Sequence, residues 1–333
     1  MNSHSTPLLP EERELVGGVI AGQRRALAKA ITLIESTRHD HQERAAAVLD
    51  ALLPHTGKAL RIGLTGVPGV GKSTFIEAFG LHLIAQGLKV AVLAIDPSSS
   101  RSGGSILGDK TRMERLSQQE AAFIRPSPSA GTLGGVAEKT REALLACEAA
   151  GFDVVIVETV GVGQSETVVA GMTDVFVLLQ LPNAGDDLQA IKKGIMELAD
   201  VVIYNKADLD ATAAERACLQ MKAALSLLHA SSPHWQPPVM PTSALRGQGI
   251  DKVWQTLLDY RMAMTASGEF DTKRKRQSLD WMWSMIDAGL RHRFREHPAV
   301  NATLPDITRG VEAGEVAPTA AAHRLLNLMN RYF

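Results

Sequence analysis

One glycine-rich stretch constrains the fold of this chain more than any other. GVPGVGKS at residues 66–73 follows an apolar run, RIGLT, and precedes a helical pattern, TFIEAFGLHLIAQG. It matches G-x-x-x-x-G-K-[ST] at every fixed position, in the strand–loop–helix context that a phosphate-binding loop requires. In such a loop the glycines let backbone N–H groups face the phosphates, and the helix N-terminus adds its positive end. The motif therefore predicts a nucleotide-binding α/β core.

The motif also assigns roles to the residues of the loop. We expect Lys72 to bridge the β- and γ-phosphates and Ser73 to ligate Mg²⁺. The other residues of the predicted nucleotide-binding loop are Gly66, Val67, Pro68, Gly69, Val70, Gly71 and Thr74.

Short apolar runs alternate with helical patterns between residue 60 and about residue 245. The runs are RIGLTG, KVAVLAID, AAFIRPS, DVVIVET, DVFVLLQ, DVVIYN and PVMPTSA. Near-continuous Val, Ile and Leu indicate strands buried on both faces, and their alternation with helices indicates crossover connections. We predict an α/β fold of the P-loop NTPase type, a three-layer sandwich with a mostly parallel sheet.

Helical periodicity marks both flanks of this core. We predict a helical N-terminal extension over residues 1–57, the P-loop core over 58–262 and a helical C-terminal arm over 263–333. The arm begins with a basic run, KRKR at 273–276. Such a run is most often a solvated face, and we interpret it so.

Two later segments predict which base the nucleotide carries. YNKADL at 204–209 ends an apolar strand and contains N-K-x-D, the guanine-reading pattern of P-loop GTPases. The Asp208 carboxylate would accept hydrogen bonds from guanine N1 and N2, donors that adenine lacks. Asn205 would brace the loop, and the Lys206 stem would lie over the base. PTSAL ends the next strand, and it resembles a loop that contacts the guanine oxygen through Ser243, Ala244 and Leu245.

Carboxylates at predicted strand ends and in one loop are candidates for the magnesium site, because Mg²⁺ prefers oxygen ligands. Asp96 ends KVAVLAID, Asp109 lies in SILGDKTR, and Glu158 ends VVIVE. A turn cap is the alternative for Asp96, and a solvated loop acid for Asp109. After Glu158, we expect Gly161 to donate its N–H to the γ-phosphate. Gln164 is a candidate for orienting the attacking water.

Composition excludes several classes of function. The 333 residues carry a formal net charge of −1, so bulk electrostatics favours neither nucleic acid nor an anionic membrane. The two cysteines form no C-x-x-C pair, which argues against a disulfide framework. We predict a cytoplasmic protein with no nucleic-acid partner and no membrane partner.

Together the motifs resemble one family, the MeaB/ArgK-type GTPases associated with methylmalonyl-CoA mutase, in the nucleotide-dimerising (SIMIBI) branch of P-loop GTPases. The resemblance covers roughly residues 12–330. It rests on GVPGVGKST, AIDPSSS, GDKTRM, RPSPSAGTLGGVA, ETVGVGQSE, QLPNAGDDLQAIKKGIMELAD and NKAD.

The resemblance implies a G-protein chaperone that binds GTP or GDP with Mg²⁺ and serves an adenosylcobalamin-dependent acyl-CoA mutase. It implies that hydrolysis by the free protein is slow and that the partner accelerates it. The residues around Mg²⁺ would be Ser73, Asp96, Asp109 and Glu158. Residues 180–193 would form an additional switch, in which Lys192 is a candidate for entering the nucleotide site. The C-terminal helices resemble a homodimerisation arm, with Trp281, Trp283 and Met285 as interface or core residues.

Three alternatives remain open to the sequence. A metal-insertion GTPase shares the branch, but the chain shows no His-rich or Cys-containing metal motif. A kinase that phosphorylates a transport component is compatible with the P-loop, although N-K-x-D favours GTP. A GTP-bound scaffold that never hydrolyses its nucleotide is a non-enzymatic third.

Overall fold

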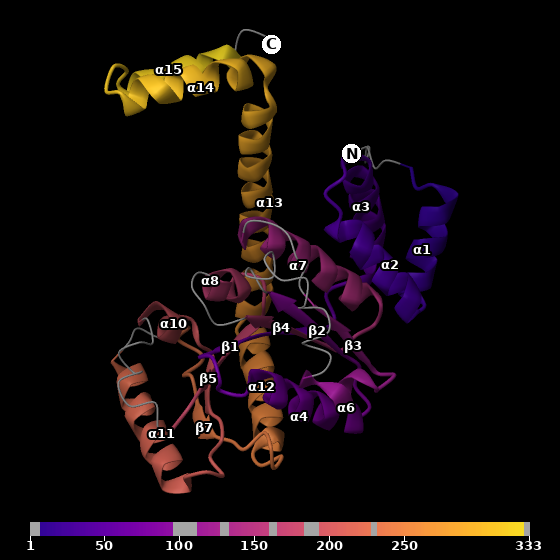
Figure 1. Cartoon of the computed structure of the whole chain (residues 1–333). Helices are drawn as coiled ribbons and strands as arrows, with labels where there is room; N and C mark the ends of the chain where they lie inside the picture. Colours follow the sequence, from indigo (N-terminus) through magenta and orange to yellow (C-terminus); the bar gives the residue numbers. More distant parts are fainter. Residues whose placement is uncertain are drawn as a thin grey trace. The chain divides into compact units, whose positions relative to one another are not determined.

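The computed structural model describes residues 7–95, 112–126, 133–159, 165–182, 193–227 and 232–329. The chain divides into two compact units, Met1–Arg274 and Lys275–Phe333 (Figure 1). Asp96, Asp109, Gly161, Gln164 and Lys192, which the sequence singled out, lie outside the described residues.

The first unit is built on a seven-stranded sheet whose strand pairs are all parallel. The strand order is β3-β2-β4-β1-β5-β6-β7. The strands are β1 (Leu60–Gly66), β2 (Val90–Ile95), β3 (Ala122–Arg125), β4 (Val154–Thr159), β5 (Val175–Gln180), β6 (Val201–Tyr204) and β7 (Val239–Pro241). Each strand coincides with one of the apolar runs, so the predicted parallel α/β fold is confirmed.

Helices precede the sheet, connect its strands and follow it. They are α1 (Pro10–Ile20), α2 (Arg24–Glu35), α3 (His39–Leu52), the 3₁₀ turn η1 (Leu53–His55), α4 (Lys72–Ala85), α6 (Glu114–Ser117), α7 (Leu133–Ala149), α8 (Ser165–Ala170), α10 (Lys193–Leu198), α11 (Ala211–Ser226), α12 (Ile250–Ala266), α13 (Glu269–Glu296), α14 (Pro298–Glu312) and α15 (Pro318–Met329).

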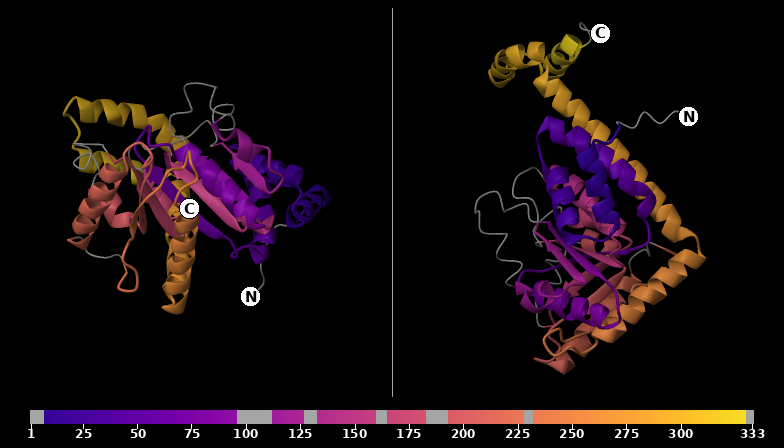
Figure 2. Two further views of the ribbon diagram at one scale, coloured as in Figure 1. Left: turned by 90° about the horizontal axis from the view of Figure 1, so that it is seen from below. Right: turned by 90° about the vertical axis from the view of Figure 1, so that its right-hand side faces the viewer.

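Alternating side chains of the strands pack against helices on opposite faces of the sheet. Ile62 and Leu64 of β1 join the cluster formed with α4, α6 and α12. The other face packs against α7, α8, α10 and α11 (Figure 2). The N-terminal helices α2 and α3 contact α7, so α1–α3 extend that second helical layer.

Aspartates at the amino ends of three strands bind the backbone of a neighbouring strand. Asp153 accepts from Lys89 N, Asp174 from Arg61 N, and Asp200 from Phe176 N, each at 2.8 Å. Each aspartate directly precedes a strand that starts with valine. The repeated Asp-Val pairs therefore supply acceptors for backbone N–H groups at the amino ends of the strands. This end of the sheet is opposite the phosphate-binding loop.

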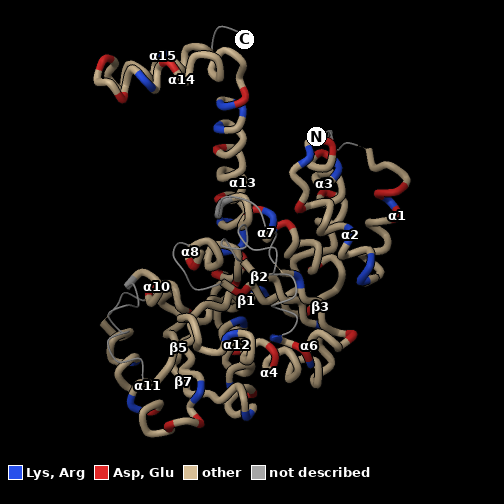
Figure 3. Tube along the Cα trace, viewed as in Figure 1, with Lys and Arg blue, Asp and Glu red and all other residues tan. Residues whose placement is uncertain are grey.

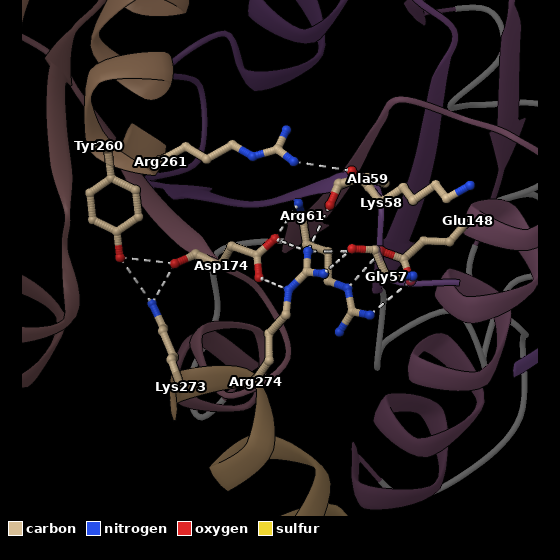
Figure 4. Close-up of polar contacts among 10 residues, drawn as sticks. All are labelled: Gly57, Lys58, Ala59, Arg61, Glu148, Asp174, Tyr260, Arg261, Lys273 and Arg274. Carbon is tan, nitrogen blue, oxygen red and sulfur yellow. Dashed lines mark hydrogen bonds and ion pairs between the residues drawn. The ribbon is translucent and has the colours of Figure 1, made fainter. Parts of the chain in front are cut away.

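A network of charges joins this same edge to the start of α13 (Figure 4). Arg274 donates to both carboxylate oxygens of Asp174, at 2.7 and 2.6 Å, and to the carbonyls of Gly57 and Ala59. Its guanidinium also lies 4.7 Å from the Phe270 ring centroid. Asp174 and, more weakly, other acids hold the pKa of Arg274 above its usual range against the lowering effect of burial.

The expectation of a wholly solvated KRKR face is therefore wrong for its first two residues. Lys273 donates to the Asp174 carbonyl at 2.5 Å and lies 3.5 Å from the Asp200 carboxylate. Lys275 and Arg276 are exposed as expected. The run mixes two roles because helical geometry turns successive residues toward different surroundings.

The second unit contains the rest of α13 and the pair α14 and α15, which pack on each other. Along α13, large apolar side chains recur at helical spacing and are 40–59% exposed: Leu279, Met282, Trp283, Met285, Ile286 and Leu290. None of the described helices of the chain is both long and apolar enough to span a membrane.

Candidate guanine nucleotide site

The glycine-rich loop connects β1 directly to α4. Gly69 and Gly71 have φ of 79° and 88°, the left-handed region in which side chains are disfavoured. A Cβ on Gly66 would lie 2.5 Å from the Leu179 carbonyl oxygen of β5. Backbone conformation and close approach to a neighbouring strand therefore both require glycine in this loop.

The Lys72 ammonium lies over its own loop. Its Nζ donates to the Gly66 carbonyl at 2.8 Å and to the Val67 carbonyl at 3.4 Å. Burial lowers the pKa of Lys72, while the carboxylates of Glu158 and Glu166 act in the opposite direction. Lysine in this place can exchange its carbonyl acceptors for phosphate oxygens without leaving the loop.

The other side chains of the loop and of the first turn of α4 divide between core and solvent. Val70 is fully buried and packs in the core with Phe75, while Pro68 and Thr74 are exposed. Ser73 is half-buried, one residue into α4.

The base-reading segment is joined to the phosphate loop by an asparagine. Asn205 Nδ2 donates to the Val70 carbonyl at 2.9 Å, and Asn205 Oδ1 accepts from Ala244 N at 3.1 Å. Both Asn205 and Ala244 are buried. One side chain thus holds together the phosphate loop, the N-K-x-D segment and the S-A-L segment, which the sequence had placed in one site.

Lys206 makes a second connection between the same two loops. Its Nζ donates to the Gly69 carbonyl at 2.8 Å. Its φ is 62°, and within the described ranges no other non-glycine residue has positive φ. A non-glycine residue in this region is strained, and such strain is concentrated at functional sites. The strained residue thus carries a side chain that reaches from the N-K-x-D segment to the glycine-rich loop.

The pKa of the Asp208 carboxylate is lowered by groups within and beside the S-A-L and N-K-x-D segments. A hydrogen bond from the Ser243 hydroxyl holds the pKa of Asp208 below its usual range, and Arg246 and Lys206 add to the effect. Arg246 Nε lies 3.8 Å from Asp208 Oδ2. Asp208 is therefore ionised and acceptor-only near neutral pH, as a partner for two guanine donors must be. Leu245 is exposed beside it.

Glu158 lies at the carboxyl end of β4, the strand adjacent to β1. It stands in register with Leu64, two residues before Gly66, and its side chain is buried. Its neighbour Thr159 donates to Thr65 Oγ1 at 2.8 Å, which ties the ends of β4 and β1 together. Glu158 is therefore near the phosphate loop and within electrostatic range of Lys72.

Two residues of the site escaped sequence reasoning. Arg246 directly follows S-A-L, so its position next to the motif in the sequence could have identified it. Glu166 ends the stretch ETVGVGQSE, but its electrostatic effect on Lys72 appears only in the folded chain.

Comparison with known proteins decides the family. The family described as methylmalonyl Co-A mutase-associated GTPase MeaB matches residues 27–299. The chain belongs to this family. It is accordingly a GTPase that binds GTP, and the predicted resemblance is confirmed.

Similar proteins cover between 78% and 98% of the chain. The Escherichia coli protein "GTPase ArgK" is 55% identical over 78% of this chain and 79% of its own length. The mouse protein "Methylmalonic aciduria type A homolog, mitochondrial" is 46% identical over 98% of this chain and 82% of its own length. A solved structure titled "LAO/AO transport system kinase" has a TM-score of 0.77 at 39% identity, covering 98% of this chain and 100% of that one.

Proposed function

We propose that this GTPase is a cytoplasmic chaperone for an adenosylcobalamin-dependent acyl-CoA mutase of the methylmalonyl-CoA mutase type. In this role it gates cofactor delivery and protects or reactivates the mutase. The observation that carries the proposal is the match over residues 27–299 to a family named for association with that mutase. The mouse relative, named for methylmalonic aciduria, supports the same partner.

The nucleotide site supports a mechanism based on positioning and charge stabilisation, which are the main demands of phosphoryl transfer. Lys72 would move from its carbonyl acceptors to the β- and γ-phosphates. Gly161 would donate to the γ-phosphate, and Gln164 would help to orient water. Asp208, Ser243, Ala244 and Leu245 would bind the guanine edge, while Asn205 holds the loops and Lys206 covers the base.

Magnesium fits the oxygen donors that the described part of the site supplies. Ser73 is the second residue of α4, next to Lys72, and the buried Glu158 carboxylate lies at the adjacent strand end. With Asp96 and Asp109 they would form the oxygen-rich set that Mg²⁺ prefers. When bound, Mg²⁺ would neutralise charge on the phosphate oxygens. Lys72 would then share that charge from the side of the P-loop.

Regulation would come from loops that respond to the γ-phosphate, because such contacts order switch segments and hydrolysis releases them. We propose that free turnover is slow and that mutase docking completes the site. Lys192, in the additional switch of residues 180–193, is the candidate for the completing charge.

The exposed apolar side chains along α13 support a homodimer. Leu279, Trp283, Ile286 and Leu290 are each at least 40% exposed in the single chain. A contiguous apolar stripe of this kind typically marks an interaction site. A second copy would cover it, and Trp283→Glu should then yield monomers in light scattering, whereas Arg276→Glu, on an exposed polar position, should not.

A pull-down tests the partner. A cobalamin-dependent methylmalonyl-CoA mutase should be retained differently with GDP and with a non-hydrolysable GTP analogue, and the complex should hydrolyse GTP faster than the free protein. Equal retention in both states together with unchanged hydrolysis would contradict the chaperone proposal.

Kinase activity is the second candidate because the 39% identical solved structure is titled a transport system kinase. Incubation with γ-labelled GTP and candidate acceptors separates the two. Label released as free phosphate supports the GTPase chaperone, and label on a protein supports the kinase.

A further inference from the structure

Two polar side chains at the start of α8 are buried without a hydrogen-bond partner for one of their oxygens. Ser165 is 1% exposed and Glu166 is 4% exposed. Neither Ser165 Oγ nor Glu166 Oε2 has a hydrogen-bond partner in the described part of the structure. Buried polar atoms are nearly always paired, so each such exception calls for a physical explanation.

The place of α8 relates these atoms to the phosphate site. The helix packs against β4 and β1, the strands that carry Glu158 and lead into the glycine-rich loop. A Cβ on Gly63 of β1 would lie 2.9 Å from Val169 Cγ1, so glycine at this position lets α8 approach the strand closely. The packing holds α8, which has Ser165 and Glu166 in its first turn, against the sheet.

The charge of Glu166 reaches the catalytic lysine. Its carboxylate and that of Glu158 favour the charged form of Lys72, against the larger effect of burial, which lowers the lysine pKa. Lys72 Nζ donates to the Gly66 and Val67 carbonyls, and it forms no ion pair with Glu166 in the described part of the structure. The Glu166 carboxylate therefore acts on the ammonium group electrostatically, while its Oε2 has no hydrogen-bond donor in the described part of the structure.

Because Glu166 Oε2 can only accept a hydrogen bond, the group that binds it must be a donor. Phosphate oxygens are acceptors and repel a carboxylate, so they cannot pair with Oε2 directly. Water can donate one hydrogen bond to Oε2 while its own oxygen faces phosphorus. The Ser165 hydroxyl, which both donates and accepts, offers the same water a second polar contact.

We propose that Glu166 is a further catalytic residue, one that binds and orients the hydrolytic water at the γ-phosphate. The water oxygen forms a bond to the γ-phosphorus as the bond from that phosphorus to the β–γ bridging oxygen breaks. The electron pair of the broken bond leaves with GDP, and both water protons pass to the released phosphate. The assignment rests on the GTPase activity of the family and is independent of the mutase partner.

Single-turnover hydrolysis by the full chain, with protein in excess over GTP and no mutase present, tests this assignment. Glu166→Gln keeps the size of the side chain and one carbonyl acceptor but removes the charge. We expect it to slow hydrolysis by roughly 10²-fold or more, within the 10²–10⁴-fold range typical of positioned proton-accepting groups. Affinities for GDP and for a non-hydrolysable GTP analogue should stay within about twofold of the wild-type values, because the hydrolytic water takes no part in binding the nucleotide.

The matched control is Glu142→Gln on α7. Glu142 is also buried, and burial raises its pKa, so the neutral amide should be tolerated there. This variant should hydrolyse GTP at the wild-type rate. Ser165→Ala should slow hydrolysis less than Glu166→Gln, since it removes the weaker of the two polar contacts.

Two results would overturn the assignment. One is wild-type hydrolysis by Glu166→Gln with unchanged nucleotide affinity. The other is a loss of the Mg²⁺ dependence of GDP binding in Glu166→Gln, which would assign the carboxylate to the metal instead of the water. A wild-type chain that never hydrolyses GTP would contradict the GTPase function itself, so the two failures are distinguishable.

Discussion

The polar groups at the carboxyl ends of the sheet's strands and those at the amino ends are paired in different ways. These two ends of the sheet are called here the carboxyl edge and the amino edge. At the carboxyl edge, Lys72, Asn205 and Lys206 each donate to a carbonyl of the glycine-rich loop. At the amino edge, Arg274 forms a paired contact with Asp174 (Figure 4). Carbonyl contacts of the first kind can be exchanged for a ligand, whereas buried charge pairs of the second kind are costly to open.

The difference separates function from stability within one sheet. The carboxyl ends of parallel strands are where open α/β sheets bind ligands, and the loops there keep donors and acceptors available. At the amino edge, the acids at strand starts have partners within the protein, as the bonds of Asp174 and Asp200 illustrate. Figure 3 shows acidic and basic residues interspersed over the described chain. The two edges therefore differ in how their charged groups are paired and not in the sign of their charge.

The largest effect expected from a single substitution is on base selection. Asp208→Asn replaces a carboxylate, which has two acceptor oxygens, by an amide. The amide NH₂ group would face the N–H donors of guanine, but it can donate to the carbonyl oxygen that xanthine has in place of the guanine amino group. We expect the preference for GTP over xanthosine triphosphate to fall by about 10⁴-fold, as when a site loses a buried polar match. Competition binding with both nucleotides measures the ratio.

Asp210→Asn is the control for that substitution. Asp210 accepts from Ala213 N as the N-cap of α11, and asparagine caps helices as well as aspartate. Its base preference should equal that of the wild type. An unchanged preference in Asp208→Asn would remove the base-reading role assigned to Asp208.

The second largest effect is expected at the opposite edge. Arg274→Met leaves the Asp174 carboxylate buried with fewer donors, and breaking a buried pair by removing one partner costs about 3–5 kcal/mol. Denaturant unfolding should report this loss in the free energy of unfolding. GDP affinity should stay within about twofold, because the pair is at the edge away from the loops.

Arg276→Met provides the matched control within the same basic run. Arg276 is exposed and its nearest acid, Asp280, lies 3.8 Å away on the same helix. Exposed pairs contribute about 0–1 kcal/mol, so little stability should be lost. Equal losses in the two variants would show that the Asp174 network contributes no more than a surface contact.

These two sites also show what the sequence could and could not predict. The sequence could predict that Lys72, Asn205 and Asp208 belong to one candidate site, because each belongs to a short motif with fixed spacing that follows a strand. Asp174 and Arg274 are 100 residues apart, and no local pattern relates them. Continuous apolar runs predicted all the strands of the sheet, since burial on both faces leaves a direct compositional signature.

Other features were visible in the sequence but lacked a local interpretation. Asp-Val begins DVVIVET, DVFVLLQ and DVVIYN, yet its meaning depends on which strands are neighbours in the sheet. Glu166 ends the stretch ETVGVGQSE, but only the folded chain shows that it is buried and acts electrostatically on Lys72. Pairing across the sheet and burial are tertiary properties, so periodicity alone does not report them.

The third effect should be the reverse of the one expected for Arg274→Met. Lys72→Ala removes the ammonium from the phosphate loop, and loss of one such charged donor costs about 2.7–4 kcal/mol in hydrolysis or nucleotide binding. Thermal unfolding without nucleotide should change little, because Lys72 contacts backbone carbonyls of its own loop. Lys252→Ala, at an exposed position of α12, is the control and should retain full activity. A large stability loss in Lys72→Ala would break the proposed division between the edges.

The smallest effect tests how far the amino-edge pattern contributes to stability. Asp153 accepts from Lys89 N at 2.8 Å, but this bond is exposed, unlike the buried bond from Phe176 N to Asp200. Water can replace the Asp153 acceptor, so Asp153→Ala should cost about 0.5–1.5 kcal/mol, a typical net value for one hydrogen bond. Asp200→Ala should cost more, since it leaves Phe176 N without its acceptor in the core. If denaturant unfolding gives the same loss in the free energy of unfolding for both variants, burial does not determine how much each aspartate contributes to stability.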